Sequence, residues 1–117
     1  MKSLGKPPEI RDEAKRILEA ISDPERYAIM LTMARHGEGV SFSQLASAFR
    51  ANHNTLSRHL KTLTHATLVW NFYERREGKD HSFYKLSAMG KKLLSSLKPE
   101  LEVTAQRSAT RNAPVSA

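Results

Sequence analysis

The side chains best suited to chemistry in this 117-residue sequence are amides, hydroxyls and cations that lie between residues 53 and 65. At about 100° per residue, Leu56, Leu60 and Leu63 share one face of a helix. The opposite face and its shoulders carry only polar and basic residues: Asn54, Thr55, Ser57, Arg58, Lys61, Thr62 and His65. Arginine and asparagine make bidentate hydrogen bonds to base edges, and hydroxyls bind phosphates. Because ordinary solvated helix faces mix both signs in i,i+4 pairs, this face favours a helix that enters the major groove of DNA.

A second basic group surrounds Gly78, in a turn predicted over residues 77–80. Its basic members are Arg75, Arg76, Lys79 and His81, and the acids that partly offset them are Glu74, Glu77 and Asp80. A basic loop on two strands is suited to the DNA backbone or to a narrow minor groove. We therefore expect a hairpin wing that contacts DNA.

The charge of the chain is concentrated in one part of the sequence. The formal net charge is +7, yet residues 1–49 carry seven basic and seven acidic side chains, whereas residues 50–92 carry nine basic and only three acidic ones. Clustered positive charge is typical of a protein that binds a polyanion.

The absence of cysteine excludes disulfides, thiolate metal sites, iron–sulfur clusters and a cysteine nucleophile, and it favours an intracellular location. No apolar run is long enough to span a bilayer. Residues 1–8 lack the apolar core of a signal peptide. We therefore expect a cytoplasmic protein without membrane contact.

The elements that would position these side chains follow from periodicity and capping. Helices are predicted over residues 9–21, 24–35, 42–49 and 53–65, strands over 68–73 and 81–86, and a last helix after Ser87 that Pro99 interrupts or kinks. Asp23, Ser41, Asn52 and Ser87 are predicted N-caps, and Ser41 has capping-box spacing to Gln44.

This order predicts an α+β, mostly helical fold: a winged helix-turn-helix with a two-stranded β-hairpin wing. The expected organisation is a flexible arm over residues 1–8, one domain over residues 9–98 that includes dimerisation helices, and a partly disordered extension over residues 99–117.

Two features of the predicted strands and last helix concern packing. The aromatic residues Trp70, Phe72 and Tyr73 are expected to pack the sheet onto the helices, the alternative being that one of them stays exposed at an interface or ligand pocket. In the second strand Tyr84 and Leu86 are expected to point inward. In the last helix the residues expected to share one face are Met89, Leu93, Leu94 and Leu97.

Metal binding and catalysis find little support. The five histidines include no i,i+4 pair and no carboxylate at a supporting interval, so no metal and no cofactor is predicted, although a site shared between subunits stays open. Because the sequence has no phosphate-binding loop and no nucleophile motif, an enzyme is not expected.

The ordered set of motifs resembles the ArsR-type family of winged-helix repressors over residues from about 10 to 98. The motifs that carry the resemblance are Ser22–Arg26, Asn54–Leu63, Ala66–Val69, Glu77–Lys79 and Phe83–Ser87. The resemblance implies a homodimer that binds a roughly two-fold operator, with recognition helices about 34 Å apart, and that blocks transcription.

Residue roles follow from the same resemblance. The recognition-helix contacts would be Asn54, Thr55, Ser57, Arg58 and Lys61, the wing contacts Arg75, Arg76 and Lys79, and the phosphate contacts Ser41 and Ser43. The first and last helices would join the subunits through Ile10, Ala14, Ile17, Leu93, Leu97 and Leu101.

Two departures from the family pattern are visible. Thr67 stands where the family usually has glycine after the recognition helix, so a different turn into the strand is expected. The cysteines that sense metal in many members are missing, because the matching stretch is residues 44–48, Gln-Leu-Ala-Ser-Ala.

The sequence predicts a homodimeric repressor of transcription that binds double-stranded DNA sequence-specifically, with an unidentified effector as a further partner. Two alternatives are an architectural protein that contacts phosphates without reading bases, and a winged-helix adaptor whose basic surface binds an acidic protein.

Overall fold

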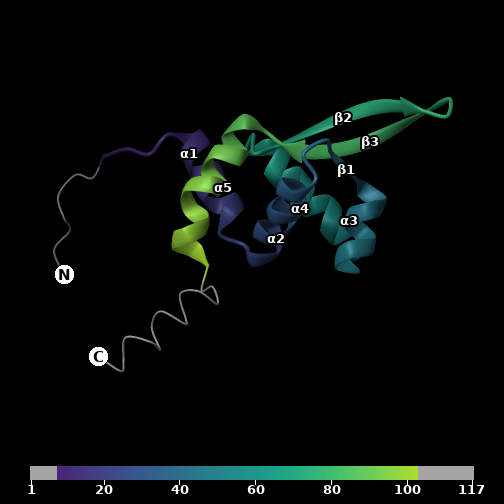
Figure 1. Cartoon of the computed structure of the whole chain (residues 1–117). Coiled ribbons are helices and arrows are strands. Elements are labelled where there is room, and N and C mark those ends of the chain that lie inside the picture. Colours follow the sequence, from purple (N-terminus) through teal and green to yellow (C-terminus); the bar gives the residue numbers. More distant parts are fainter. Residues whose placement is uncertain (1–7, 103–117) are drawn as a thin grey trace, which may run out of the picture.

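The computed structural model describes residues 8–102 and shows five helices and three strands (Figure 1). The elements are α1 (Asp12–Ile21), α2 (Pro24–Arg35), β1 (Val40–Ser41), α3 (Phe42–Phe49), α4 (His53–His65), β2 (Val69–Arg76), β3 (Lys79–Leu86) and α5 (Ala88–Leu101). This order confirms the predicted fold class, with α3 and α4 as the helix-turn-helix and β2–β3 as the wing. Residues 1–7 of the predicted arm (1–8) and residues 103–117 of the predicted extension (99–117) lie outside the described residues.

Four of the helices, α2 to α5, begin as predicted because their caps are local, and Ser87 caps α5. The Asp23 carboxylate accepts hydrogen bonds from the backbone N–H of Glu25 and Arg26, at 2.7 and 3.3 Å. Ser41 and Gln44 form the complete capping box of α3, and Asn52 caps α4. Each of these contacts spans only a few neighbouring residues, so the local sequence determines it.

Helix α1 starts at Asp12, later than predicted. Its N-cap position is Arg11, whose side chain makes no capping hydrogen bond. Asp12 and Glu13 follow in the first turn, where negative charge is favourable. Ile10 therefore precedes the helix, and its side chain is exposed.

The sheet has three strands in the order β1-β3-β2, one more than the predicted hairpin. β1 pairs Val40 with Tyr84 and Ser41 with Phe83. A strand this short cannot show the alternation that identifies a strand in a sequence, so β1 was not predictable. Of the predicted turn only Glu77 and Gly78 connect the strands. Both have positive φ, as in the type I′ turn.

The aromatic residues of β2 do not pack onto the helices, so that expectation is wrong. Trp70 and Tyr73 are 56% and 70% exposed, and only Val69 of this strand reaches the core. The hairpin extends well past the helices (Figure 1), which leaves its far part without a helical partner. Phe72 instead stacks on Phe83, on the face of the sheet opposite the helices, with 5.7 Å between the ring centroids.

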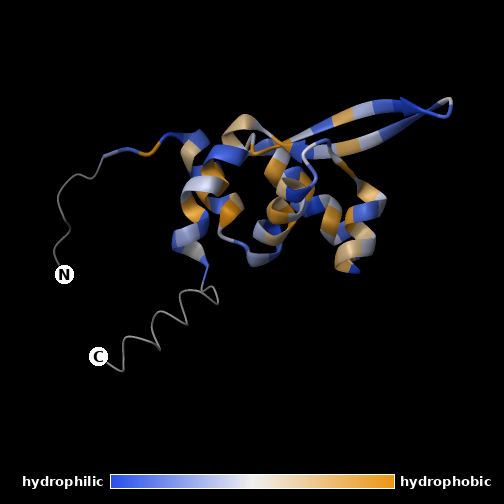
Figure 2. Ribbon diagram, viewed as in Figure 1, coloured by the Kyte–Doolittle hydropathy of each residue, from blue (hydrophilic) through white to orange (hydrophobic). Residues whose placement is uncertain are grey.

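The core lies between the helices and the base of the sheet, where the apolar sides of the ribbon meet (Figure 2). The largest fully buried side chains are Met30, Met33, Leu45, Leu56, Leu63, Leu68 and Val69. Leu86 is buried and Tyr84 packs partly against this core, as predicted.

Helix α5 continues through Pro99, so the predicted interruption does not occur. The proline lies close to the end of the helix, so its missing N–H affects the last turn alone. The Glu102 N–H still donates to Lys98 O at 3.2 Å. Met89 does not share the buried face of Leu94: its side chain is 49% exposed.

The turn from α4 into β2 keeps a left-handed residue although glycine is absent. Thr67 has φ of 62°, its N–H donates to Thr64 O, and Leu68 N–H donates to Leu63 O. These two hydrogen bonds form a Schellman motif, which usually has glycine at this position. The turn is therefore retained despite the threonine, contrary to the expectation of a different one.

Candidate nucleic-acid interface

Helix α4 presents the polar face that the sequence predicts. Leu56, Leu60 and Leu63 are buried, and Asn54, Ser57, Arg58, Lys61 and His65 are exposed. Within residues 8–102, neither Arg58 nor Lys61 takes part in an ion pair. Both cations are therefore available to an external anion.

The two hydroxyl residues beside this face lie on opposite shoulders of α4. Thr55 is half-buried and lines a cavity of about 480 Å³ next to α2, together with Ala28 and Phe49. Ser57 lies on the other shoulder, at a cleft that α4 shares with Asn71 and Tyr84 of the sheet. Of the two, Ser57 is the more open to a ligand.

The start of α3 supplies hydroxyl groups and a helix N-terminus. Ser43 is exposed, and Ser41 is half-buried with its hydroxyl accepting from Gln44 N–H at 3.1 Å. In the capping box the hydroxyl oxygen accepts, so its proton remains free to donate. Hydroxyls at a helix N-terminus are suited to a phosphate group.

The wing tip is electrostatically weaker than its arginines suggest. Arg75 lies 3.8 Å from Asp80 and donates to Gly78 O, and Arg76 donates to Glu74 at 3.1 Å. The Arg76 guanidinium also lies 4.5 Å from the centre of the Phe83 ring. Lys79 is exposed, and no ion pair within the described part of the chain includes it.

The predicted DNA contacts and the predicted dimer contacts lie in different parts of the molecule. In Figure 1, α3 and the hairpin extend to one side, and α1 and α5 lie at the other. An interface through α1 and α5 would therefore leave α3 and the wing free.

The residues predicted at the dimer interface are partly used within the chain. Ile17 and Leu93 pack against the core, Ala14 and Leu97 are half-buried, and Ile10 is exposed. The side chain of Leu101 lies outside the described residues.

Leu18 and Met89 of the same helices were not among the predicted interface residues, and both are exposed. Leu18 belongs to the apolar stripe of α1. That stripe is broad enough to offer one edge to the core and the other to a partner.

A contact between α2 and α4 was also not predictable from spacing. His59 lies with its Nε2 3.3 Å from a Glu25 carboxylate oxygen and its Nδ1 3.3 Å from the Arg26 guanidinium. One ligand atom each from Asp23, Glu25 and His59 lie within 4.8 Å of one another. Arg26 also lies 3.7 Å from Asp23, so a guanidinium already supplies the positive charge that these groups require.

The same arginine joins three helices. Its Nε and Nη2 donate to the carbonyl oxygens of Ala20 and Glu19 at the end of α1. Partial burial raises the pKa of the Asp23 carboxyl, but the N–H groups of Glu25 and Arg26 and the charge of Arg26 outweigh it, so that this pKa is lowered overall. The cluster thus stabilises the position of α4 relative to α1 and α2.

None of the described helices has the length and apolar character needed to cross a membrane.

Residues 21–69 match the family model described as a helix-turn-helix domain. No curated protein sequence is significantly similar to the chain.

Solved structures share the fold. The homodimeric winged helix-turn-helix DNA-binding domain of Mb0332 from Mycobacterium bovis, a possible ArsR-family transcriptional regulator, is 24% identical over 80% of this chain and 85% of its own, with a TM-score of 0.65. Reduced HlyU from Vibrio cholerae is 24% identical over 76% of this chain and 88% of its own, with a TM-score of 0.60. MepR from S. aureus, in a complex with DNA, is 19% identical over 87% of this chain and 88% of its own, with a TM-score of 0.61.

The family match covers residues 21–69, which include the helix-turn-helix, and the solved structures align with 76 to 87% of the chain. The chain therefore has a winged helix-turn-helix fold.

Proposed function

We propose that the protein is a homodimeric transcription regulator that binds double-stranded DNA and represses by occupying its operator. The observation that carries this proposal is the outward face of α4, where Asn54, Arg58 and Lys61 are exposed on a helix that contains no acidic residue. An acid-free face in a protein of this fold matches the negative potential of the major groove.

The α4 face divides into base-reading and backbone-holding groups. Arg58 and Asn54 have the geometry for bidentate contacts to guanine and adenine, respectively. Lys61, Ser57 and Ser43 are suited to phosphates, which fix the register of the helix on the duplex. Thr55 is a secondary contact because it is half-buried beside α2.

The wing contributes chiefly through Lys79. Arg75 and Arg76 are paired with Asp80 and Glu74, so that each would have to exchange a protein partner for a phosphate. Because exposed pairs of this kind are weak, both arginines can exchange partners, and they are therefore secondary contacts.

Dimerisation would use α1 and α5, at the end of the molecule away from the wing. Exposed apolar side chains on both helices support this surface, as does the homodimeric neighbour from Mycobacterium bovis. Two recognition helices about 34 Å apart would read half-sites one helical turn apart, and an occupied operator would exclude the polymerase.

The test begins with selection of bound fragments from random double-stranded DNA, using the full chain. We expect a near-palindromic motif with half-sites about one turn apart. On that motif Arg58→Ala should weaken binding by about 1–3 kcal/mol and relax the base preference at one position. Lys92→Ala, which removes an exposed cation from α5, is the matched control and should retain both affinity and preference.

Other outcomes would identify the alternatives. Bound DNA without any motif, with a steep salt dependence, would indicate an architectural protein. DNA affinity that is the same in Arg58→Ala and in the unmodified chain would contradict the proposed interface and favour a protein partner for the basic surface.

A further inference from the structure

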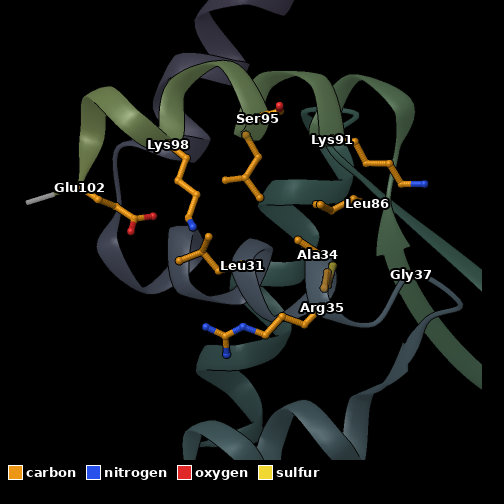
Figure 3. A pocket seen from close by; sticks show the side chains of 11 residues that line it. Leu31, Ala34, Arg35, Gly37, Leu86, Lys91, Ser95, Lys98 and Glu102 are labelled. Carbon is orange, nitrogen blue, oxygen red and sulfur yellow. The ribbon is translucent and has the colours of Figure 1, made fainter. Parts of the chain in front are cut away.

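A cavity of about 390 Å³ lies between α2 and α5, away from the α4 face (Figure 3). Its lining includes Leu31, Ala34 and Arg35 of α2 and Lys91, Leu94 and Lys98 of α5. A volume near the lower end of small-molecule sites suits a compact ligand rather than a macromolecular segment.

The cavity combines an apolar floor with cations at its rim. Leu86 and Leu94 are buried in the floor, and Leu31 is half-buried beside them. In Figure 3, Lys98 extends from α5 toward Leu31, and the Arg35 guanidinium lies along α2 below the same leucine. Within residues 8–102 neither cation takes part in an ion pair.

Glu102 is the one acidic side chain among the described residues that line the cavity, and it has a partner. It accepts a hydrogen bond of 2.5 Å from the Tyr27 hydroxyl of α2. Burial and this carboxylate raise the pKa of Tyr27 to about 12, so the hydroxyl keeps its proton at neutral pH. With Glu102 held toward Tyr27, the cations Arg35, Lys91 and Lys98 give the described lining a positive net charge.

We propose that this cavity binds an amphipathic anion, a small molecule with an aliphatic chain and a single carboxylate. The apolar part would cover Leu31 and Ala34 beside the buried Leu86 and Leu94, and the carboxylate would lie between Arg35 and Lys98. An apolar ligand would leave both cations without a partner, and an inorganic anion would leave Leu31 and Ala34 in water, so only a molecule with both parts satisfies the whole surface.

The site remains open if the protein dimerises through α5. Lys91, Ser95 and Lys98 recur at helical spacing and share one side of this helix. Leu93 and Leu97 lie on a different side, where they line a small gap with Ile21 and Tyr27. This inference goes beyond the proposed function and does not depend on it, because ligand binding is measured without DNA.

The experiment is calorimetric titration of the full chain with decanoate, below the concentration at which decanoate forms micelles, and with decanol as the neutral probe. We expect decanoate to saturate one site per chain and decanol to bind at least about tenfold more weakly, because a charge-assisted contact is lost.

Two variants and one control locate the carboxylate. Arg35→Gln and Lys98→Gln should each weaken decanoate binding about tenfold. Lys92→Gln removes an exposed cation from the same helix outside the cavity and should leave the affinity essentially unchanged. Ala34→Phe places a ring in the cavity from an exposed position and should abolish binding without unfolding the protein.

The proposal is overturned by any of three results. These are no saturable decanoate binding, equal affinity for decanoate and decanol, or equal losses in Lys98→Gln and Lys92→Gln.

Discussion

Thr67 shows how one residue can hold an unfavourable backbone conformation. It is a β-branched residue at a φ of 62°. Steric crowding of Cβ in this left-handed region costs an L-residue about 1–2 kcal/mol. The surrounding contacts impose this conformation: two backbone hydrogen bonds of the Schellman motif, and the Ser87 hydroxyl, which donates to Thr67 O at 2.7 Å.

Thr67→Gly should therefore raise the free energy of unfolding by about 1 kcal/mol, because glycine adopts this conformation without crowding. The larger conformational entropy that glycine loses on folding offsets only part of this gain. Urea denaturation measures the change. Thr64→Gly, within α4 itself, is the control and should not stabilise the protein. A destabilised Thr67→Gly variant would show that the threonine side chain contributes more than its backbone costs.

Asp23 stabilises the start of α2 in a pH-dependent way. Its pKa is lowered from the ordinary value of 3.8. Its contribution is therefore complete at higher pH and is lost as the pH falls through the folded-state value. Asp23→Ala should reduce the free energy of unfolding at pH 7 by about 1 kcal/mol, because the cap is lost.

Asp23→Asn is the matched variant, since asparagine caps helices as well as aspartate but does not titrate. Below pH 3.8 the unmodified protein should lose stability with falling pH more steeply than Asp23→Asn does. Parallel pH profiles in thermal unfolding would contradict the role of this carboxylate.

Among the elements, α5 packs on the turn that follows α4, and Gly90 of α5 lies against the backbone of Leu68. A methyl group at Gly90 would overlap the carbonyl oxygen of Leu68. The buried Ser87 side chain caps α5 by accepting from Gly90 N–H and donates to the same turn, so α5 and the end of α4 form one unit.

Gly90→Ala should lower the free energy of unfolding by about 3 kcal/mol, at the upper end of typical over-packing costs, because the clash involves backbone. Gly37→Ala is the control: a methyl group there meets nothing within 4 Å, and its effect should be small. Similar midpoints in urea for both variants would rule out the close packing at Gly90.

The wing and α4 are predicted to act differently on DNA. Lys79→Ala should weaken binding to all sequences alike and lower the salt slope by about one, because it removes a phosphate contact without changing base readout. Fluorescence anisotropy at several salt concentrations, on selected and scrambled DNA, measures both. If Lys79→Ala and Arg58→Ala act identically, the division between backbone holding and base reading is wrong.

For the whole molecule, the separation of its two ends predicts that assembly can be changed by a substitution that does not touch the surface predicted to contact DNA. Leu18 is 55% exposed and belongs to α1, the helix that lies at the end away from the wing (Figure 1). Leu18→Glu should shift a dimer toward monomer, because burying an unpaired carboxylate at an interface is unfavourable. Operator affinity should fall with it, since two half-sites would no longer be joined.

Sedimentation equilibrium measures the shift in assembly. Tyr73→Ser removes a 70% exposed apolar side chain from the hairpin and should leave the assembly unchanged. An unchanged dimer in Leu18→Glu would exclude this edge of α1 from the interface.

The amino-acid sequence by itself determined the features that depend on a few neighbouring residues. The caps at Asp23, Ser41 and Asn52 and the polar face of α4 follow from hydrogen bonds and helical spacing over short stretches of chain, and the structure reproduces them. The fold class was predictable for the same reason, since the order of such local signals is enough to identify a winged helix.

Only the tertiary structure decided the contacts between distant segments. β1 exists because Val40 meets Tyr84, the wing arginines are paired because two strands place Asp80 opposite Arg75, and His59 lies between Glu25 and Arg26 because α4 packs on α2. The cavity between α2 and α5 belongs to this class as well. Such contacts depend on how elements pack in three dimensions, and no spacing along the chain encodes them.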